Sequence, residues 1–437
     1  MKIHKLRLKN FRGFEEKNFN FHPHFNVIIG VNGTGKTAIL EGLCVAVGSF
    51  FLGNDYAENR HIQNDDIRIV NYEDDMQEQF PVQIECWGKV QGEHLSWQRE
   101  LSGPHNKTTF IKARNIKELS KNVQQKVRDG ENIELPIIVY YATERLWKER
   151  LDSGKINLPS RFRGYYNGLR PTSSLKFFLK WFKEKEMAAI QHKKDYVALK
   201  VVRKAVTLCI ADCTNIYYEL NPDKEQTLMM ELKGGKVLPF RLLSDGVRNM
   251  LAMVADIAFR CALLNPKLGE NTITKTSGVV LIDELDLHLH PSWQKQAVHN
   301  LKRTFPQIQF ITTTHSPFVI QELEEGELIK LDSEEETIGQ YVDQSLEDIA
   351  ENVQGVENPQ WSHKRRQMYE AAKQYYQTLQ KMKGDTSVDE VRILRAKLDE
   401  LSKPFADNLA YYAFLEQERL FKEAELGTIS DSYATLK

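Results

Sequence analysis

The stretch GVNGTGKT at 30–37 has the residue types and the spacing that bind a phosphate chain. Its three glycines let the backbone turn tightly and point successive N–H groups at an anion. A helix expected over 38–52 adds a positive dipole end at the same place. Lys36 can then reach the β- and γ-phosphates, and Thr37 can offer its hydroxyl to Mg²⁺. Because the stretch follows a buried apolar run at 25–29, we interpret it as a nucleoside triphosphate site rather than an ordinary glycine turn.

Two carboxylates end a second apolar run, GVVLIDE at 278–284. If this run is a parallel strand beside the strand at 25–29, its carboxyl end lies next to the bound triphosphate, where ligands of open α/β sheets bind. Asp283 would then hold Mg²⁺, and Glu284 could polarise the water that attacks the γ-phosphate. An Asp-Glu pair at a strand end says little by itself, and the phosphate loop upstream gives it this meaning.

Three further positions fit the same phosphate site. Ser244, in the stretch LLSDGVR, is in the N-cap position of a long apolar helix, and a serine-capped helix N-terminus can bind an anion. His315 ends another buried strand, IQFITTTHSPF. Arg12 lies in a turn between two expected strands, NFRGF at 10–14, which would bring it back near the phosphate loop. A surface arginine is the alternative at that position.

Apolar periodicity and turn residues predict the other elements. Strands or strand-rich stretches are expected at 2–9, 67–111 (a small antiparallel sheet), 135–147 and 227–241. Helices are expected at 172–217 (two helices), after Ser244 to about 264, at 292–304 and, as several helices, at 346–425. Residues 150–170, rich in Gly, Pro and Arg, are expected to form a loop or lid.

Charge is distributed unevenly along the chain, although the formal net charge is only −1. Residues 145–204 contain 16 Lys/Arg against 5 Asp/Glu, and residues 321–351 contain 12 acidic residues against one lysine. The small net charge argues against a generally basic nucleic-acid binder. Any contact with nucleic acid, DNA included, is therefore expected to be local, with 145–204 as its candidate surface. A solvated helix face is the alternative for these lysines.

Composition is that of an ordinary globular protein, with 41% hydrophobic and 27% charged residues. A chain of 437 residues can form two or three domains. No run approaches the roughly 18 uninterrupted apolar residues of a membrane span, and the N-terminus lacks the apolar core of a signal peptide. The five cysteines lie mostly in apolar surroundings, which favours core packing over a zinc site. We therefore expect a cytoplasmic protein with reduced thiols and no membrane contact.

Together these motifs resemble the ABC-class ATPase head of SMC, RecF and OLD proteins. The resemblance rests on the phosphate loop (Walker A), LSDGVR at 243–248 (the signature), Walker B at 279–284, Asp286, His315 and the turn with Arg12. It implies an α/β fold, in which a P-loop ABC-type head has a mixed central sheet and a small antiparallel sheet, with a helical insertion and a helical C-terminal region. The implied segments are 1–145 (first part of the head, the Walker A lobe), 146–226 (helical, basic insertion), 227–335 (second part of the head) and 336–437 (helical C-terminal region).

The resemblance also implies site residues. Two heads enclose two ATP molecules in such proteins, so Ser244 and Gly246 of one head would face the γ-phosphate held by Lys36 of the other. Asp286 would cross the dimer, and His315 would sense the γ-phosphate. The residues implied for ATP are Arg12, Asn32, Gly33, Thr34, Gly35, Lys36, Thr37, Ala38, Ser244, Gly246 and Asp286. Those implied for Mg²⁺ are Thr37 and Asp283, and those implied for hydrolysis are Glu284, His315 and Lys36.

The chain departs from the family pattern at three places. Its signature is LSDGVR instead of LSGGQ, which suits the SMC/RecF-like branch better than transporters. No convincing glutamine marks the Q-loop, whose place is occupied by Thr143-Glu144-Arg145. His288 and His290 could suggest a metal-ligand pair, but metals at phosphate sites prefer oxygen ligands, so packing is the favoured interpretation.

Several additions that related ATPases carry are not expected in this chain. The interval between Thr37 and Ser244 has no sustained heptad repeat, which excludes SMC-like coiled-coil arms. A Toprim nuclease needs a D-x-D pair, and none follows His315. No HNH-like cluster of histidine and asparagine is present either. We therefore expect an ATPase without a nuclease site of its own.

Four stretches point to one branch of these ATPases, namely DELDLHLHP, TTHSPF, QSLEDIAENVQGV and PFADNLAYYAFLEQERLF. They resemble the PtuA ATPases of Septu anti-phage systems and of some retrons. The resemblance implies a partner nuclease of HNH type (PtuB) that the ATPase senses or gates, joined in retrons by a reverse transcriptase and its msDNA. Two other functions stay open. One is an OLD- or RecF-like repair or processing ATPase acting directly on DNA, and the other is an ATP-binding scaffold that hydrolyses ATP poorly.

Overall fold

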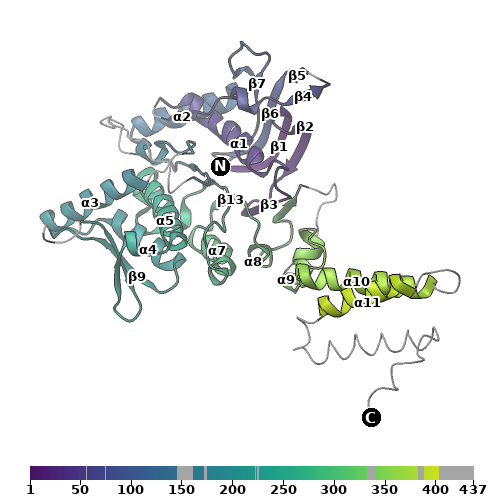
Figure 1. The fold of residues 1–437 in the computed structure, drawn as a ribbon. Helices are drawn as coiled ribbons and strands as arrows, with labels where there is room; N and C mark the ends of the chain where they lie inside the picture. Colours follow the sequence, from purple (N-terminus) through teal and green to yellow (C-terminus); the bar gives the residue numbers. More distant parts are fainter. Residues whose placement is uncertain are drawn as a thin grey trace. The chain divides into compact units, whose positions relative to one another are not determined.

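Figure 1 shows the fold of this protein in a computed structural model. The chain divides into two compact units, Met1–Ile349 and Ala350–Lys437, and each is described by itself. The structure describes residues 1–55, 57–73, 75–144, 161–171, 175–221, 223, 226–331, 341, 343–381 and 388–402.

Five parallel strands form the central sheet of the first unit, in the order β14-β3-β13-β12-β8. Their bounds are Phe25–Ile29 for β3, Ile137–Tyr141 for β8, Gly278–Ile282 for β12, Ile308–Thr313 for β13 and Leu328–Lys330 for β14. Every residue of β3, β8, β12 and β13 is buried. Strands covered on both faces can be apolar throughout, which explains the continuous apolar runs of the sequence.

The order of these strands corrects one expectation. β12, which ends just before Asp283, pairs with β13 and β8, so β13 lies between β12 and the phosphate-loop strand β3. The sequence had predicted β12 directly beside β3. Every pairing in this sheet is parallel, whereas a mixed sheet was expected. The reason is that several buried strands are equally apolar, so the pattern does not say which of them are neighbours.

A second, antiparallel sheet has the order β2-β1-β6-β7. Its strands are β1 (Lys2–Phe11), β2 (Phe14–Asn20), β6 (Val82–Val90) and β7 (Glu93–Leu101). Helix α1 (Lys36–Val47) contacts this sheet and also β13 of the central sheet. With the 3-10 turn η1 (Gly48–Gly53), it is long and apolar enough to cross a membrane by length and composition alone. However, 78% of that stretch is buried in the protein, as is usual for a core helix.

The expected antiparallel region at 67–111 is divided between two sheets. β4 (Ile69–Tyr72) and β5 (Asp75–Glu78) form a separate two-stranded ribbon, whereas β6 and β7 join β1. The short helix η2 (Asn64–Asp66) precedes this ribbon, and η3 (Ile111–Ala113) and helix α2 (Arg114–Arg128) follow β7.

The predicted helical insertion is helical only in part. Among the described residues, its α-helices are α3 (Leu175–His192) and α4 (Val197–Cys209). Of the expected lid at 150–170, residues 150–160 lie outside the described residues, and the described part contains a short 3-10 turn at Phe162–Tyr165. Cys213 then begins a strand, although a helix was expected up to 217. The three-stranded antiparallel sheet consists of β9 (Cys213–Tyr218), β10 (Leu228–Leu232) and β11 (Val237–Pro239). Pairing of β9 with β10 therefore overrides the local helical pattern, and the sheet crosses the predicted boundary at 226.

Of the remaining helices, those at 245–264, 291–304 and beyond 346 lie where the sequence predicts helices, whereas the short ones at 162–165, 240–242, 266–275 and 317–320 were not predicted. In the first unit they are η4 (Phe162–Tyr165), η5 (Phe240–Leu242), α5 (Asp245–Leu264), η6 (Pro266–Asn271), α6 (Thr272–Lys275), α7 (Pro291–Thr304), α8 (Pro317–Ile320) and α9 (Leu346–Asp348). A π-helical stretch, η7 (Ile349–Val353), spans the boundary of the units. In the second unit, α10 (His363–Lys381) packs against α11 (Val388–Ser402). The final motif of the sequence, from 404 onward, lies outside the described residues.

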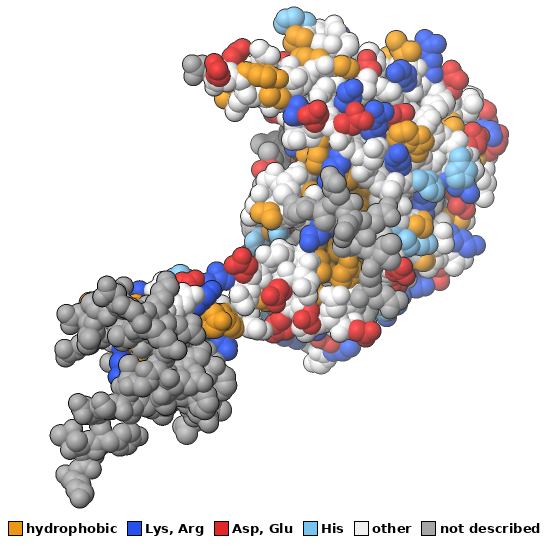
Figure 2. Space-filling view, turned by 90° about the vertical axis from the view of Figure 1, so that its right-hand side faces the viewer, with side chains coloured by type: hydrophobic (Ala, Val, Ile, Leu, Met, Phe, Trp, Pro, Cys, Tyr) orange, Lys and Arg blue, Asp and Glu red, His pale blue; other side chains and the backbone are white. Residues whose placement is uncertain are grey.

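The surface carries charges of both signs. On the face drawn in Figure 2, Lys and Arg side chains are interspersed with Asp and Glu side chains rather than separated by sign. This arrangement agrees with the formal net charge of −1.

A buried ion pair connects α5 to the end of β8. Arg260 Nε lies 2.7 Å from Asp256 Oδ2, with the two side chains 1% and 2% exposed. The Tyr141 hydroxyl donates to the same oxygen at 2.8 Å, and Arg260 also donates to the carbonyl oxygens of Gly164 and Tyr166. Burial, together with Asp256, raises the pKa of Tyr141, so the phenol keeps the proton that it donates. The pair therefore holds α5 against both β8 and the chain around Gly164.

Replacing Asp256 should reveal how much this pair contributes. Asp256→Ala is expected to lower the free energy of unfolding by about 3–5 kcal/mol, because Arg260 stays charged and buried without its carboxylate. Chemical denaturation measures the change. Asp195→Ala, which removes the exposed partner of Lys200, is the control and should change stability little. Equal losses in the two variants would contradict the importance assigned to the buried pair.

Candidate nucleotide-binding site

The phosphate loop lies between β3 and α1, as the sequence predicts. Gly35, the N-cap of α1, has a left-handed φ of 101°, and an added Cβ there would lie 2.7 Å from the ring of Phe14. Glycine therefore permits both the turn and the close approach of the aromatic ring. The Lys36 ammonium donates to the carbonyl oxygens of Gly30 at 2.8 Å and Val31 at 3.2 Å. Lys36 thus lies along its own loop, at the N-terminus of α1.

Thr37 and Asp283 bring two oxygen ligands together at the edge of the central sheet. The Thr37 hydroxyl donates to Asp283 Oδ2 at 2.9 Å, although the residues are 246 positions apart. Thr37 is exposed, whereas Asp283 is buried. Mg²⁺ prefers oxygen ligands such as hydroxyl and carboxylate groups, so these two residues fit the ion that the sequence implies.

The chain after β12 is held by Thr313, the last residue of β13. Thr313 Oγ1 donates to Asp283 Oδ1 at 2.6 Å and accepts the Glu284 N–H at 2.7 Å. Glu284 has a left-handed φ of 50°, which a residue with a side chain rarely adopts unless its surroundings impose it. One hydroxyl therefore contacts both carboxylate residues that the sequence assigns to Mg²⁺ and to water activation.

Thr314 repeats this arrangement one residue further along. Its hydroxyl donates to Asp286 Oδ1 at 2.5 Å and accepts the Ser316 N–H at 3.0 Å. His315, between Thr314 and Ser316, is exposed. The sequence interpretation singled out only His315 and missed Thr313 and Thr314. The signal was the threonine run at the end of a buried strand, because buried hydroxyl groups need hydrogen-bond partners.

Helix α5, which begins in the signature stretch, packs against the loop that follows β12. Ser244 is its N-cap, is exposed, and makes no capping hydrogen bond with its side chain. An added Cβ on Gly246 would lie 2.3 Å from the His288 carbonyl oxygen, and Asn249 donates to the Leu287 carbonyl oxygen at 3.3 Å. Close contact between two backbones of one chain therefore requires glycine at 246, whatever its role toward a nucleotide.

Gly246→Ala tests this backbone contact. The added methyl group must push α5 away from His288, so the free energy of unfolding should fall by about 1–3 kcal/mol. Chemical denaturation measures the loss. Gly13→Ala is the control, because an added Cβ at Gly13 meets no atom within 4 Å. A Gly246→Ala protein as stable as the Gly13→Ala protein would refute the close packing.

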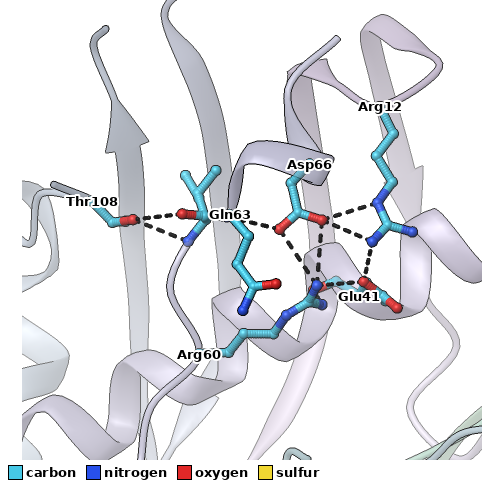
Figure 3. Close-up of polar contacts among 7 residues, drawn as sticks. Arg12, Glu41, Arg60, Gln63, Asp66 and Thr108 are labelled. Atoms are coloured by element: carbon cyan, nitrogen blue, oxygen red, sulfur yellow. Dashed lines mark hydrogen bonds and ion pairs between the residues drawn. The ribbon is translucent and has the colours of Figure 1, made fainter. Parts of the chain in front are cut away.

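Arg12 lies in a cluster of four charged side chains beside α1, drawn in Figure 3. Its guanidinium contacts Glu41 of α1, and its Nε donates to Asp66 Oδ1 at 2.9 Å. Arg60 contacts the same two carboxylates. Because the Asp66 side chain is fully buried, its charge requires compensation, and the two guanidinium groups share this role toward Asp66 and Glu41. The turn therefore brings Arg12 to the helix that follows the phosphate loop, where its partner Glu41 lies about one helical turn after Thr37.

Because Arg12 and Arg60 share their carboxylate partners, replacing Asp66 should destabilise the protein more than replacing Arg12. Asp66→Ala is expected to lower the free energy of unfolding by about 2–4 kcal/mol, since it leaves Arg12 and Arg60 facing Glu41 alone. Arg12→Ala should cost less, because Arg60 still compensates both acids. The two losses should not add in the double variant, because both residues belong to one network. Chemical denaturation of the three proteins tests this, and simple additivity would count against a shared network.

The other predicted positions lie as follows. Asn32 and Gly33 are exposed in the phosphate loop, where the Thr34 hydroxyl donates to the Val31 carbonyl oxygen at 2.8 Å. Ala38 is buried in α1. Thr143 and Glu144 follow β8, whereas Arg145 lies outside the described residues.

The histidines after Walker B have different positions. His290 is the N-cap of α7 and accepts the Ser292 N–H at 3.3 Å, which is a structural role. His288 is exposed and has a left-handed φ of 61°.

The chain is similar to several known proteins. The model of a family described as "AAA domain" matches residues 5–213. "Retron Vc95 probable ATPase" of Vibrio cholerae serotype O1 biovar El Tor is 27% identical over 382 residues, covering 72% of this chain and 71% of the relative. "Septu protein PtuA" of Bacillus thuringiensis is 24% identical over 368 residues, covering 81% of this chain and 84% of the relative.

Shorter or more distant similarities are also present. "DNA replication and repair protein RecF" of Lactococcus lactis subsp. lactis is 49% identical over 43 residues, which cover 10% of this chain and 12% of the relative. The solved "SMC head domain from Thermotoga maritima" matches with a TM-score of 0.42 and 16% identity, covering 76% of this chain and 94% of that one.

The fold and the site define a P-loop protein of the α/β class, with a parallel central sheet, smaller antiparallel sheets and surrounding helices. Over most of its length, the chain is homologous to retron ATPases and to Septu PtuA proteins.

Proposed function

We propose that this chain is an ATP-binding and ATP-hydrolysing subunit that senses or gates a partner nuclease in an anti-phage defence complex. One combined observation carries the proposal. A phosphate loop with Thr37 in contact with Asp283 occurs in a chain that is similar, over 72% and 81% of its length, to a retron ATPase and to a Septu protein. The contact supports the nucleotide chemistry, and the relatives support the defence context.

The residues at the sheet edge account for each requirement of hydrolysis. N–H groups of the phosphate loop and of the α1 N-terminus bind phosphate oxygens, and Lys36 exchanges its carbonyl partners for the β- and γ-phosphates. When bound by Thr37 and Asp283, Mg²⁺ neutralises charge on the phosphate oxygens. Glu284 orients the attacking water and accepts its proton.

We further propose that two copies of the chain enclose ATP, as a dimer or a higher homo-oligomer. Ser244 is exposed at the N-terminus of α5 without a capping bond from its side chain, so the helix end can receive an anion. The γ-phosphate would come from the second copy, facing Ser244 and Gly246. Asp286 and His315 would then lie near the contact between the copies, where His315 can respond to the γ-phosphate.

The proposed partners are a small HNH nuclease of PtuB type and, in a retron, a reverse transcriptase with its msDNA, all in the cytoplasm. The basic stretch 145–204 is the proposed nucleic-acid surface, because clustered cations gain affinity by releasing counterions. In its described part, Lys183 lies over the ring of Tyr218 at 5.5 Å and Lys185 over that of Tyr196 at 4.8 Å. Part of this charge is therefore used within the protein.

The second candidate function is an OLD- or RecF-like ATPase that acts directly on DNA in repair or processing. The short similarity to RecF favours it, although that similarity covers only 10% of the chain. DNA ends or gaps should then stimulate ATP hydrolysis, and no nuclease partner is required. A third function, an ATP-driven scaffold, needs ATP binding but little hydrolysis.

Expression of the native operon with a tag on this chain tests the partner. Mass spectrometry and nucleic-acid analysis of the purified complex should find a small HNH protein, with or without a reverse transcriptase and its RNA–DNA product. An isolated homo-oligomer whose ATP hydrolysis rises with added DNA would instead favour the repair function.

Two substitutions separate binding from hydrolysis. Lys36→Ala should abolish binding of a fluorescent ATP analogue, because the phosphate charge loses its cation. Glu284→Gln should keep binding within about threefold and lower kcat about 10²- to 10³-fold, because the general base is lost. Protection against phage should fail in both variants. If Glu284→Gln protects normally while Lys36→Ala does not, the scaffold function is favoured, and a fully active Lys36→Ala protein would refute all three functions.

A further inference from the structure

The position of β13 decides what lies between the phosphate loop and the carboxylates. Thr313 pairs with Ile28 of β3, and its neighbour Thr312 pairs with Ile282 of β12. The end of β13 therefore faces the start of the phosphate loop on one side and Asp283 on the other. Side chains at this end can contact both halves of the nucleotide site.

We propose that Thr313 is a positioning residue for ATP hydrolysis, whose hydroxyl fixes the Asp283 carboxylate and the Glu284 backbone relative to each other. This inference rests on the proposed ATPase function. Thr313 does not need to touch the nucleotide, because it acts through the two residues that do.

The Thr313 hydroxyl acts both as a hydrogen-bond donor and as a hydrogen-bond acceptor. The single O–H donates to Asp283 Oδ1 at 2.6 Å, and a lone pair of the same oxygen accepts the Glu284 N–H at 2.7 Å. Asp283 Oδ2 is in turn contacted by the Thr37 hydroxyl at 2.9 Å. The carboxylate is therefore held at both oxygens, which sets the direction in which it can offer a lone pair.

The backbone conformation of Glu284 indicates that the contact with Thr313 helps to set the position of this residue. Its φ of 50° is left-handed, and such a conformation persists in a residue with a side chain only when several contacts impose it. The backbone N–H of Leu285 donates to the Thr313 carbonyl oxygen at 2.9 Å, so Thr313 holds the chain on both sides of the Glu284 Cα. Without the hydroxyl, the Glu284 N–H loses this contact, and the backbone that directs the Glu284 side chain is held less firmly.

Thr312 supplies a matched control on the same strand. It is as fully buried as Thr313, and its hydroxyl donates at 3.2 Å to the Asn26 carbonyl oxygen. Replacing either threonine by valine removes one buried hydroxyl without a large change in shape. Only the change at 313 removes a contact with Asp283 and Glu284.

The test compares purified full-length Thr313→Val, Thr313→Ser and Thr312→Val proteins with the unaltered chain. Thr313→Val should lower kcat about 10- to 100-fold and change the KM for ATP less than about threefold, since a small misplacement of catalytic groups has effects of this size. Thr313→Ser, which keeps the hydroxyl, should restore kcat to within about threefold. Thr312→Val should have normal kcat. A Thr313→Val protein with normal kcat would overturn the inference.

Two readouts separate positioning from a general loss of structure. In a Glu284→Gln background, Thr313→Val should lower kcat by a smaller factor than in the unaltered chain, because the part of its effect that acts through Glu284 is already lost and only the part that acts through Asp283 remains. Full additivity would show that Thr313 does not act through Glu284. The Glu284 amide should also exchange hydrogen about 10-fold faster in Thr313→Val than in Thr312→Val, measured without nucleotide. Equal exchange would overturn the inference. Because this readout needs no hydrolysis, it distinguishes a failure of the Thr313 contact from a chain that does not hydrolyse ATP, which would defeat the proposed function.

Discussion

The parallel register of β3, β13 and β12 is the constraint on which the rest of the site depends. Thr312 pairs with Val27 on one side and Ile282 on the other, so three strands end at one edge of the sheet. Neighbouring strands lie about 4.8 Å apart, which brings the chain segments leaving those ends within reach of one another. A slip of one residue would turn every side chain of the strand to the opposite face. Backbone pairing therefore places the start of the phosphate loop and Asp283 at the same end of the sheet.

Local patterns in the sequence were sufficient to predict the phosphate loop, the strand before Asp283 and the start of α5 at Ser244. Glycine spacing, apolar runs and capping residues act over a few positions, and packing did not override them there. The order of strands was not predictable in this way, because β12 and β13 are equally buried and their neighbours are chosen by contacts between distant segments. The partners of Thr313 depend on that order. The strand beginning at Cys213 was missed because pairing with β10 overrides helical spacing.

The cluster around Arg12 shows a second limit of sequence interpretation. Resemblance placed Arg12 near the nucleotide, and the turn does lead to the correct lobe. Its actual partners come from α1 and from η2, the latter 54 residues away, and charged residues at such distances carry no mark of their pairing. The ion pairs of this cluster connect the turn at 10–14, α1 and η2, and so help to fix the positions of these three segments relative to one another. The assignment of Arg12 to ATP stays a prediction from the family.

The contact of α5 with the loop after β12 has a consequence for an oligomer. Gly246 and Asn249 attach the helix that bears Ser244 to the backbone of residues 287–289 within one chain. In the proposed dimer, each nucleotide lies between the phosphate loop of one copy and the α5 end of the other. Because α5 is packed closely against this loop, a shift of the loop at one nucleotide would displace the end of α5 at the other. The two nucleotides would then be taken up and released cooperatively, with a sigmoidal dependence of activity on ATP concentration.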